Sequence, residues 1–394
     1  MSLPSFNPLN PELIASPYAT YAALRATSPF WSDVMGCWVV LKYDDCIGVL
    51  RDAKTYASDW RLAGLDDREQ PDESVGLQSL DGAAHGRLRS CFVKAMNGVD
   101  RGQQVGSHVR GLVRARLQAL PCTDRPFDVI EAVARPVVLE SICRAMGLHV
   151  PDEASFAHLA EDLVRGMDAG LIPDRAEPAR QAKVELNRMM ADWASSGGMA
   201  EPEGMLRKAL VFATKSDIPV GQVLSTARQL FLAGYSTTVA AAANVLLAIG
   251  SNRQMALELR KNPGLIGATL DELLRLDGPV QGTSRAVTSD ALIGEVRVKR
   301  GDIVLCLLGA ANRDPEVFPN ADAVDIARHE KARHLGFGWG PHACTGAIFA
   351  REVLQALVGE LLDQGLPMVI GDSSRIPRAT LRYPDRVMVR IEPC

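Results

Sequence analysis

The sequence lacks closely spaced pairs of cysteine, although it contains eight cysteines in all. Structural zinc sites and disulfide-stapled folds place cysteines at short spacings such as Cys-x-x-Cys. Their absence argues against both classes. Scattered thiols are typical of a reducing compartment, which favours a cytoplasmic protein. The cysteines are Cys37, Cys46, Cys91, Cys122, Cys143, Cys306, Cys344 and Cys394.

Neither sign of charge is in large excess. The 43 Lys and Arg residues are balanced by 47 Asp and Glu residues, for a net charge of −4. This balance gives no indication of a nucleic-acid partner. The chain also lacks low-complexity linkers and internal repeats, so we expect residues 1–394 to form one domain. We also expect a monomer.

Membrane-targeting features are also scarce. The N-terminal residues lack the basic start and apolar core of a signal peptide or anchor. One run, from Leu230 to Ile249, carries no charge over roughly the length of a bilayer crossing. Polar residues such as Tyr235 and Asn244 make it only mildly apolar, so we expect a buried helix and no membrane partner.

Apolar residues recur at intervals of three and four positions along most of the chain, which predicts a mainly helical protein. Strand signals are few, so the β-sheets should be small and peripheral. Residues 312–334 look irregular, and long irregular segments in compact domains are usually functional. The predicted helices cover about 18–27, 44–52, 84–96, 106–120, 127–146, 152–168, 176–196, 217–249, 263–276 and 345–364. The predicted strands cover about 37–42, 295–308 with a break at 300–302, and 386–392.

A glycine-rich stretch, HLGFGWGPHACTGAIFA, runs from His334 to Ala350 and contains one cysteine, Cys344. Its glycines permit positive φ and close approach of the backbone to a flat or bulky group. Cys344 lies where a helix should begin, and the peptide N–H groups of a helix start stabilise a thiolate. An iron porphyrin fits because thiolate-bound haem needs one sulfur. The alternative is a free cysteine buried in an ordinary glycine turn.

The segment FGWGPHACTG matches every fixed position of the haem-binding signature of cytochrome P450 monooxygenases, and the chain therefore resembles that family. The resemblance covers essentially the whole chain and is strongest from 228 to 351. It implies a mainly α, triangular fold with small β-sheets, in which haem b lies between the long central helix and the cysteine loop. It also implies that Cys344 binds the iron. The signature residues at the cofactor are Phe337, Gly338, Cys344 and Gly346.

Two further residue sets acquire roles through this resemblance. Glu272 and Arg275 share one face of a predicted helix and, as a bare pair, would form a solvated surface bridge. The resemblance implies instead a buried structural network that Arg328 completes. Haem propionates are carboxylates in an apolar slot and need cationic or hydrogen-bonding partners. The resemblance assigns this role to His85, Arg89, Arg285, His334 and His342.

The long helix contains AGYSTT, which resembles the family's oxygen-binding segment. Ala233 and Gly234 are small, which leaves space for O2 and substrate beside a cofactor. Thr237 would supply a hydroxyl for proton delivery. Ser236 stands where the family usually has an acid, and a serine is no charged proton donor at neutral pH. We expect protons to arrive through Thr237 and ordered water, with Ser236 either a relay hydroxyl or a helix-filling residue.

The resemblance implies a soluble, bacterial-type monooxygenase that inserts one oxygen atom from O2 into a small or mid-sized apolar substrate by hydroxylation or O-dealkylation. Electrons would come from NAD(P)H through a ferredoxin or flavodoxin and its reductase, because no flavin- or nicotinamide-binding glycine motif is present. A basic face could receive this donor, although a solvated face is the alternative. Its residues would be Arg87, Arg101, Arg110, Arg114, Arg116, Lys331, Arg333 and Arg351.

Two other functions stay open: an H2O2-driven haem-thiolate peroxygenase, which the missing acid at Ser236 favours, and a non-catalytic haem-binding or sensor protein. Substrate contacts are expected from residues 56–80, from 160–180 and from the turn near Thr380. Small aromatic ethers, terpenoids and natural-product scaffolds all fit this expectation. The individual pocket residues expected are Leu232, Val280, Gln281 and Thr283.

Overall fold

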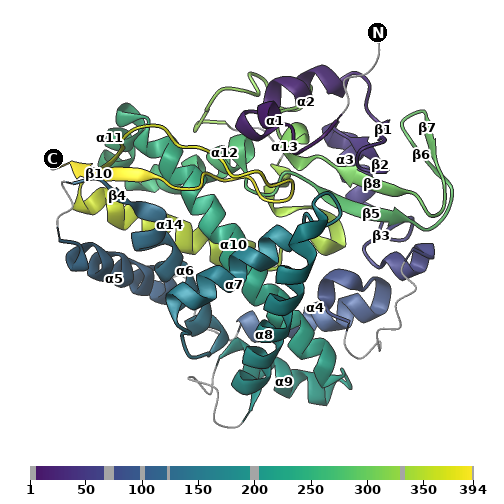
Figure 1. Ribbon diagram of the computed structural model, residues 1–394, viewed down its shortest axis with the longest axis horizontal. Coiled ribbons are helices and arrows are strands. Elements are labelled where there is room, and N and C mark those ends of the chain that lie inside the picture. The colour runs from purple at the N-terminus through teal and green to yellow at the C-terminus, as the bar shows by residue number, and fades with distance from the viewer. Residues whose placement is uncertain are drawn as a thin grey trace.

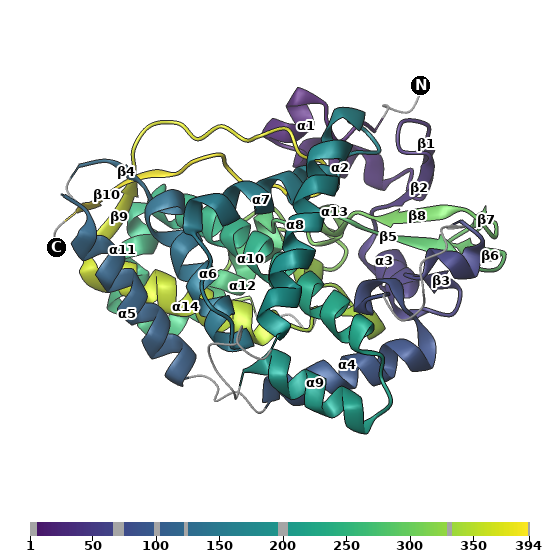
Figure 2. The same cartoon turned by 60° about the horizontal axis from the view of Figure 1, so that its bottom comes forward.

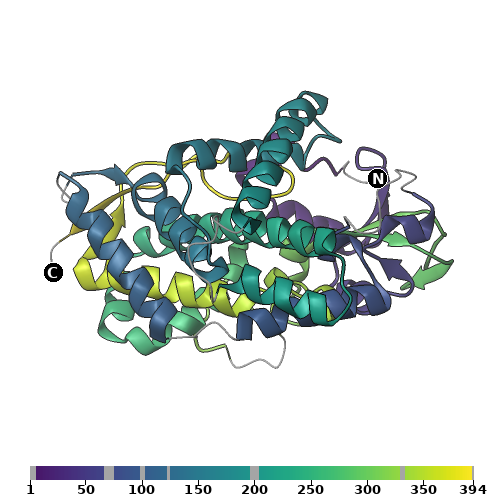
Figure 3. The same ribbon diagram turned by 90° about the horizontal axis from the view of Figure 1, so that it is seen from below.

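The computed structural model describes residues 6–65, 75–97, 103–121, 125–195, 204–328 and 333–392. Helices form most of the body, and three small sheets lie toward its ends (Figure 1). The outline is roughly triangular in this view, and the molecule is flatter when seen from below (Figure 3). This architecture agrees with the mainly helical fold predicted from the sequence.

Fourteen α-helices are present in the described residues, together with short 3-10 segments and one π-helix. The α-helices are α1 (Pro11–Ala15), α2 (Tyr18–Arg25), α3 (Tyr43–Arg51), α4 (Gly82–Asn97), α5 (Gln103–Ala119), α6 (Arg135–Met146), α7 (Glu153–Gly166), α8 (Ala176–Ala194), α9 (Met205–Lys215), α10 (Val220–Gly250), α11 (Arg253–Lys261), α12 (Ile266–Asp277), α13 (Leu308–Ala311) and α14 (Ala347–Gln364). The 3-10 segments are η1 (Trp60–Ala63), η3 (Leu77–Ser79), η5 (Pro173–Arg175), η6 (Pro263–Leu265), η7 (Leu335–Phe337) and η8 (Gly340–His342), and η4 (Ile130–Ala134) is the π-helix.

The strands form three sheets. The five-stranded sheet has the order β1-β2-β8-β5-β3, with β2 and β8 parallel and the other pairs antiparallel. Its register places Arg285 of β5 opposite Val304 of β8. The strands are β1 (Phe30–Ser32), β2 (Cys37–Val40), β3 (Tyr56–Ala57), β4 (Phe127–Asp128), β5 (Thr283–Val287), β6 (Ala291–Ile293), β7 (Val296–Val298), β8 (Ile303–Cys306), β9 (Leu366–Val369) and β10 (Met388–Glu392), of which β4-β10-β9 and β6-β7 form the smaller sheets.

Helix α10 runs through the middle of the helical body (Figure 2) and contacts α6, α8, α9, α12 and α14. Its alanine-rich second half allows this close packing, since Ala240, Ala242 and Ala243 are fully buried. Within the described residues it is also the one helix long and apolar enough to span a membrane, but 67% of its most apolar window is buried inside the fold. This supports the prediction of a core helix.

The largest difference from the predicted elements lies at residues 127–146, where one continuous helix is expected. The structure has strand β4, then the π-helix η4, then α6. Tertiary pairing overrides the helical pattern here, because Phe127 pairs with Val389 of β10. The Asp128 carboxylate also accepts hydrogen bonds from the N–H groups of Ile130 (3.0 Å) and Val387 (3.2 Å). These contacts hold the first two residues extended.

Helices α9 and α11 and strand β5 also differ from the predicted pattern, which left these residues unassigned. Helix α11 has a recognisable start, because the Asn252 side chain accepts a hydrogen bond from the Met255 N–H at 3.0 Å. The irregular segment is as predicted: the described residues between Asn312 and His334 form turns and no helix or strand.

The structure brings Glu272, Arg275 and Arg328 together in a buried network. Arg275 donates two hydrogen bonds of 2.8 Å to the Glu272 carboxylate, and Arg328 Nε lies 3.2 Å from Glu272 Oε1. Arg275 also donates to the carbonyl oxygens of Asn312 (2.8 Å) and Ala321 (2.7 Å). The network therefore fixes the irregular segment against α12, and through it the loop that carries Cys344.

Candidate functional site

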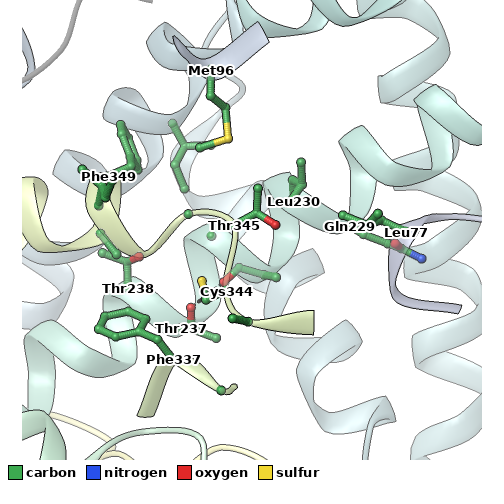
Figure 4. Close-up of a pocket in the computed structure, with 18 of the residues that line it drawn as sticks. Leu77, Met96, Gln229, Leu230, Thr237, Thr238, Phe337, Cys344, Thr345 and Phe349 are labelled. Carbon is green, nitrogen blue, oxygen red and sulfur yellow. Dashed lines mark hydrogen bonds between the residues drawn. The ribbon is translucent and has the colours of Figure 1, made fainter. Parts of the chain in front are cut away.

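A cavity of about 970 Å³ lies between α10 and the loop that carries Cys344. Side chains of α4, α6, α10 and α14 and the start of β5 form its walls. Figure 4 draws Cys344, Thr237 and Phe337 among the side chains that line this cavity. The glycine loop and the long helix thus face each other across one space.

Two glycines shape the cysteine loop for different reasons. Gly338 has φ of +67° and lines the cavity, so a side chain there would be strained. Gly340 has φ of +70°, and a Cβ on it would lie 2.2 Å from the carbonyl oxygen of Leu50. Gly340 therefore serves packing of the loop on α3, whereas Gly338 serves the cavity. The Cys344 N–H closes the loop with a 2.7 Å hydrogen bond to the Phe337 carbonyl.

The Cys344 side chain is open to the cavity, three residues before α14 begins. Burial raises the pKa of its thiol, whereas the N–H of Gly346 and the positive charges of Arg89 and Arg351 lower it without overcoming the effect of burial. The Gly346 N–H at the start of the helix therefore acts in the predicted direction, against the effect of burial. A bound metal cation would supply the missing stabilisation, because coordination deprotonates a thiol outright.

On the opposite wall, α10 presents small and hydroxylated residues. Ala233, Gly234, Thr237 and Thr238 all line the cavity. Thr237 Oγ1 donates a 2.7 Å hydrogen bond to the Ala233 carbonyl, so its oxygen is oriented as an acceptor. A Cβ on Gly234 would lie 3.0 Å from Cδ1 of Ile142 in α6. Gly234 therefore allows α6 to pack closely, in addition to leaving space in the cavity.

Ser236 does not line the cavity. Its side chain is 8% exposed, and its hydroxyl has no hydrogen-bond partner among the described residues. The α10 side chains that line the cavity from this part of the helix are those of Ala233, Gly234, Thr237, Thr238 and Ala241, and Ser236 falls beside this set and outside it. A relay role for Ser236 would need an internal water at its hydroxyl.

All five predicted propionate partners line the cavity. His85 Nε2 is buried and has no hydrogen-bond partner in the described part of the chain. Burial, with His342 and Arg89 nearby, lowers the pKa of His85 to about 4, so this imidazole is neutral at physiological pH. The Arg89 guanidinium donates to Thr345 Oγ1 at 2.9 Å, and that of Arg285 donates to the Ser284 carbonyl at 2.7 Å.

The remaining two histidines already have carboxylate neighbours. His342 Nε2 lies 2.7 Å from Oδ1 of Asp81, and its ring stacks on His85 with centroids 4.2 Å apart. His334 Nε2 lies 3.5 Å from Oδ1 of Asp271. Sequence reasoning missed Asp81, although its position four residues before His85, one helical turn away, is the signal that could have found it.

These residues fit a haem better than a metal ion held by protein side chains alone. The described residues contain no group of three or more His, Cys, Asp or Glu side chains that could hold a metal. A single thiol, several basic side chains in the cavity lining and the unsatisfied Nε2 of His85 match an iron porphyrin with two carboxylates. Cys344 is the residue that would ligate its iron.

Comparisons with known proteins agree with this chemistry. A family model described as Cytochrome P450 matches residues 240–364. The chain is 32% identical to cytochrome P450 monooxygenase PikC of Streptomyces venezuelae over 372 residues, 90% of this chain and 85% of the relative. It is 31% identical to 20-oxo-5-O-mycaminosyltylactone 23-monooxygenase of Streptomyces fradiae over 357 residues, 89% of this chain and 82% of the relative.

The chain belongs to the cytochrome P450 family. The crystal structure of CalO2 has the same fold, with a TM-score of 0.85, 24% identity and coverage of 99% of both chains. P450BioI in complex with an acyl carrier protein carrying hexadec-9Z-enoic acid gives a TM-score of 0.82 at 25% identity, over 97% of this chain and all of that chain. Membership in the P450 family implies haem and O2 as reaction partners and identifies the protein as an oxidoreductase.

The P450 cavity includes some predicted substrate residues and leaves out others. Val280 and Thr283 line it. Leu232 and Gln281, which were also predicted to contact substrate, are not among the residues that line the cavity. Gln281 is held elsewhere, because its Nε2 donates to the Gly278 carbonyl at 2.7 Å and its amide packs against Gly309. Leu232 is on the same side of α10 as Ser236, one turn earlier.

Of the longer segments predicted to contact substrate, some line the cavity and others do not. Within residues 56–80, Ser58, Trp60 and 77–79 line the cavity, whereas no described residue of 160–180 and no residue near Thr380 does so. Sequence reasoning also missed cavity residues of α10 that precede Ala233. The signal was available, since Leu230, Gln229 and Thr226 lie three, four and seven positions before Ala233 and share its face.

The predicted basic face of this P450 is smaller than expected. Arg101 and Lys331 lie outside the described residues, and Arg87 and Arg333 are exposed. Four other arginines are in ion pairs with carboxylates of the same chain: Arg110 and Arg114 with Glu360, Arg116 with Glu153, and Arg351 with Asp271. Their charges are largely balanced, which weakens the argument for an acidic electron donor at this face.

Proposed function

We propose that this P450 inserts one oxygen atom of O2 into a small or mid-sized apolar organic substrate, by hydroxylation or O-dealkylation. Electrons come from NAD(P)H through a ferredoxin or flavodoxin and its reductase. The protein acts as a soluble, cytoplasmic monomer with one domain over residues 1–394. One observation carries the proposal: Cys344 and Thr237 line a single cavity, which His85, Arg89, Arg285, His334 and His342 also line.

The cavity size supports the substrate class. Its volume of about 970 Å³ is at the upper end for ligand pockets and must accommodate the porphyrin as well as the substrate. The space that remains suits a small or mid-sized molecule. The cavity lining includes the apolar residues Leu77, Ile142, Leu230 and Val280. Such walls favour an apolar substrate and exclude water from the reacting atoms.

Residues of this chain would hold the cofactor through its iron and through its propionate groups. Cys344 would ligate the iron, and His85, Arg89 and Arg285 would contact the propionates, with His334 and His342 beside them. Thiolate-ligated haem supplies oxygen activation and favours O–O cleavage. The protein contributes binding, orientation and protons.

Thr237 is the residue best placed to handle protons. Its hydroxyl proton is held by the Ala233 carbonyl at 2.7 Å, so Oγ1 can accept a hydrogen bond from a water in the cavity. Thr237 would thereby hold a water that could carry protons into the cavity for the cofactor's oxygen chemistry. Each turnover consumes two electrons and two protons, and the second oxygen atom leaves as water.

The test is turnover under oxygen-18-labelled O2 with NADPH, a ferredoxin and its reductase, using a substrate found by spectral-shift screening of the ferric protein. We expect one labelled oxygen atom in a hydroxylated product, or, after O-dealkylation, an unlabelled alcohol and a labelled aldehyde that is trapped before it exchanges with water. Incorporation of oxygen from water into a hydroxylated product, or no NADPH-dependent product, would contradict the proposal.

A peroxygenase is the second candidate, and the observation that favours it is Ser236. Family members usually have an acid there, and the buried Ser236 hydroxyl makes no hydrogen bond to any described residue. If H2O2 without a reductase gives faster product formation than NADPH with the full electron-transfer chain, the peroxygenase is the better assignment.

A further inference from the structure

One wall of the cavity is a short segment that approaches α10 from the N-terminal part of the chain. Residues 75–80 include the 3-10 turn η3, and Val75, Leu77 and Leu80 are each 5–6% exposed. Leu77 lines the cavity beside Leu230 of α10. Figure 4 shows Leu77 against Gln229 at the same side of the cavity. The position of this segment therefore decides how far the wall reaches inward.

Two side chains of α10 fix the segment through its backbone. Thr226 Oγ1 accepts a 3.0 Å hydrogen bond from the N–H of Leu77, and Gln229 Oε1 accepts one of 3.3 Å from the N–H of Gln78. Thr226 and Gln229 are three residues apart, so they lie on one face of the helix. The Thr226 side chain is fully buried. Two consecutive peptide N–H groups are thus satisfied by the same helix face.

The residue before this pair shows how close the approach is. A Cβ on Gly76 would lie 2.6 Å from Oε1 and 2.7 Å from both Cδ and Nε2 of Gln229. The segment therefore lies directly on the amide group of Gln229, and only glycine fits without displacing it. Gly76 does not have a positive φ, so close contact explains the glycine better than backbone strain.

We propose that Gln229, Thr226 and Gly76 form a contact that sets the size of substrate this P450 accepts. The inference rests on the proposed function. Gln229 lies one turn before Ala233 and two turns before Thr237, about 6 to 12 Å along the helix from the oxygen-binding residues. The contact thus places Leu77 within the length of a mid-sized molecule from the reacting position. Weakening it moves the wall outward, which admits bulkier ligands and loosens the fit of small ones.

The test compares two ligands of the ferric haem protein, imidazole and a triarylmethyl imidazole, whose dissociation constants are measured from spectral shifts. Gln229→Ala removes one acceptor and the amide. Gly76→Ala keeps every hydrogen-bonding group and displaces the flexible end of Gln229. Matched controls are Gln254→Ala, an exposed residue of α11, and Gly111→Ala in α5, where a Cβ meets nothing within 4 Å.

We expect both cavity variants to shift the ratio of the two constants toward the bulky ligand by roughly tenfold, the lower end of what one methylene is worth in an apolar pocket. The controls should keep the wild-type ratio. An unchanged ratio in either cavity variant that binds haem would overturn the inference. If the wild type binds haem and the ratio of the two azole dissociation constants is the same in all variants, only this inference fails. A wild-type protein that does not bind haem would instead overturn the proposed function.

Discussion

Removal of Arg275 should destabilise the protein severely, and the structure allows the loss to be worked out. The Arg275 side chain is 2% exposed and ends in a network with the Glu272 carboxylate, which is 5% exposed. Arg275→Met would leave that carboxylate with Arg328 as its one remaining arginine partner at this site, and would free the carbonyl oxygens of Asn312 and Ala321. Breaking a buried pair from one side costs about 3–5 kcal/mol in unfolding free energy.

The assay is urea unfolding followed by circular dichroism, with Arg297→Met as the matched control. Arg297 pairs with Asp290 on the surface, where the two side chains are 70% and 49% exposed. The control should change the unfolding free energy by less than about 0.5 kcal/mol. If Arg275→Met also loses less than about 1 kcal/mol, the network does not hold the irregular segment as described.

Other predictions concern pH, protons and the C-terminal turn. Although burial raises the pKa of Glu272, hydrogen bonds from Arg275 and the Asp325 N–H outweigh it and lower the pKa below 4.5. The ionised Glu272 carboxylate should therefore stabilise the fold fully above pH 4.5, and this stabilisation should fade as the pH falls through the folded pKa. Urea unfolding between about pH 5 and pH 3 would measure it: the wild type should exceed Glu272→Gln in stability by more at the higher pH than at the lower. Thr237→Ala should lower the yield of product per NADPH consumed and release peroxide. Ser236→Asp should raise that yield only if Ser236 relays protons, and an equal yield would remove it from the relay. Asp168→Ala should speed hydrogen exchange at Ala379 and Thr380, because the Asp168 carboxylate is 3% exposed and accepts from both N–H groups at 3.1 and 3.0 Å; unchanged exchange would mean that other contacts hold the turn.

Local patterns predicted the parts of the site that depend on neighbours in sequence. The glycine loop, the small residues of α10 and the pairing of Glu272 with Arg275 all follow from spacing along one segment. Strand β4 did not, because Phe127 and Asp128 are extended only through pairing with β10, more than 250 residues away. Helical periodicity was the stronger local signal there, and tertiary contact overrode it.

Side-chain direction was the second thing the sequence left open. Gln281 is adjacent to Val280, but its amide turns to the Gly278 carbonyl and away from the cavity. The arginines of the predicted basic face meet carboxylates of distant helices, such as Glu360 of α14. Charge counted along the sequence therefore overstated the free positive charge of that face. Long-range packing decides both cases.

The most direct test of the account is the carbon monoxide difference spectrum of the dithionite-reduced protein, measured for wild type and for Cys344→His. The account predicts that the wild type has an absorption band at about 450 nm, which marks thiolate ligation to haem iron, and that the variant lacks this band. A wild-type protein that binds haem without this band, or a Cys344→His variant that keeps it, would contradict the assignment of Cys344 as the iron ligand.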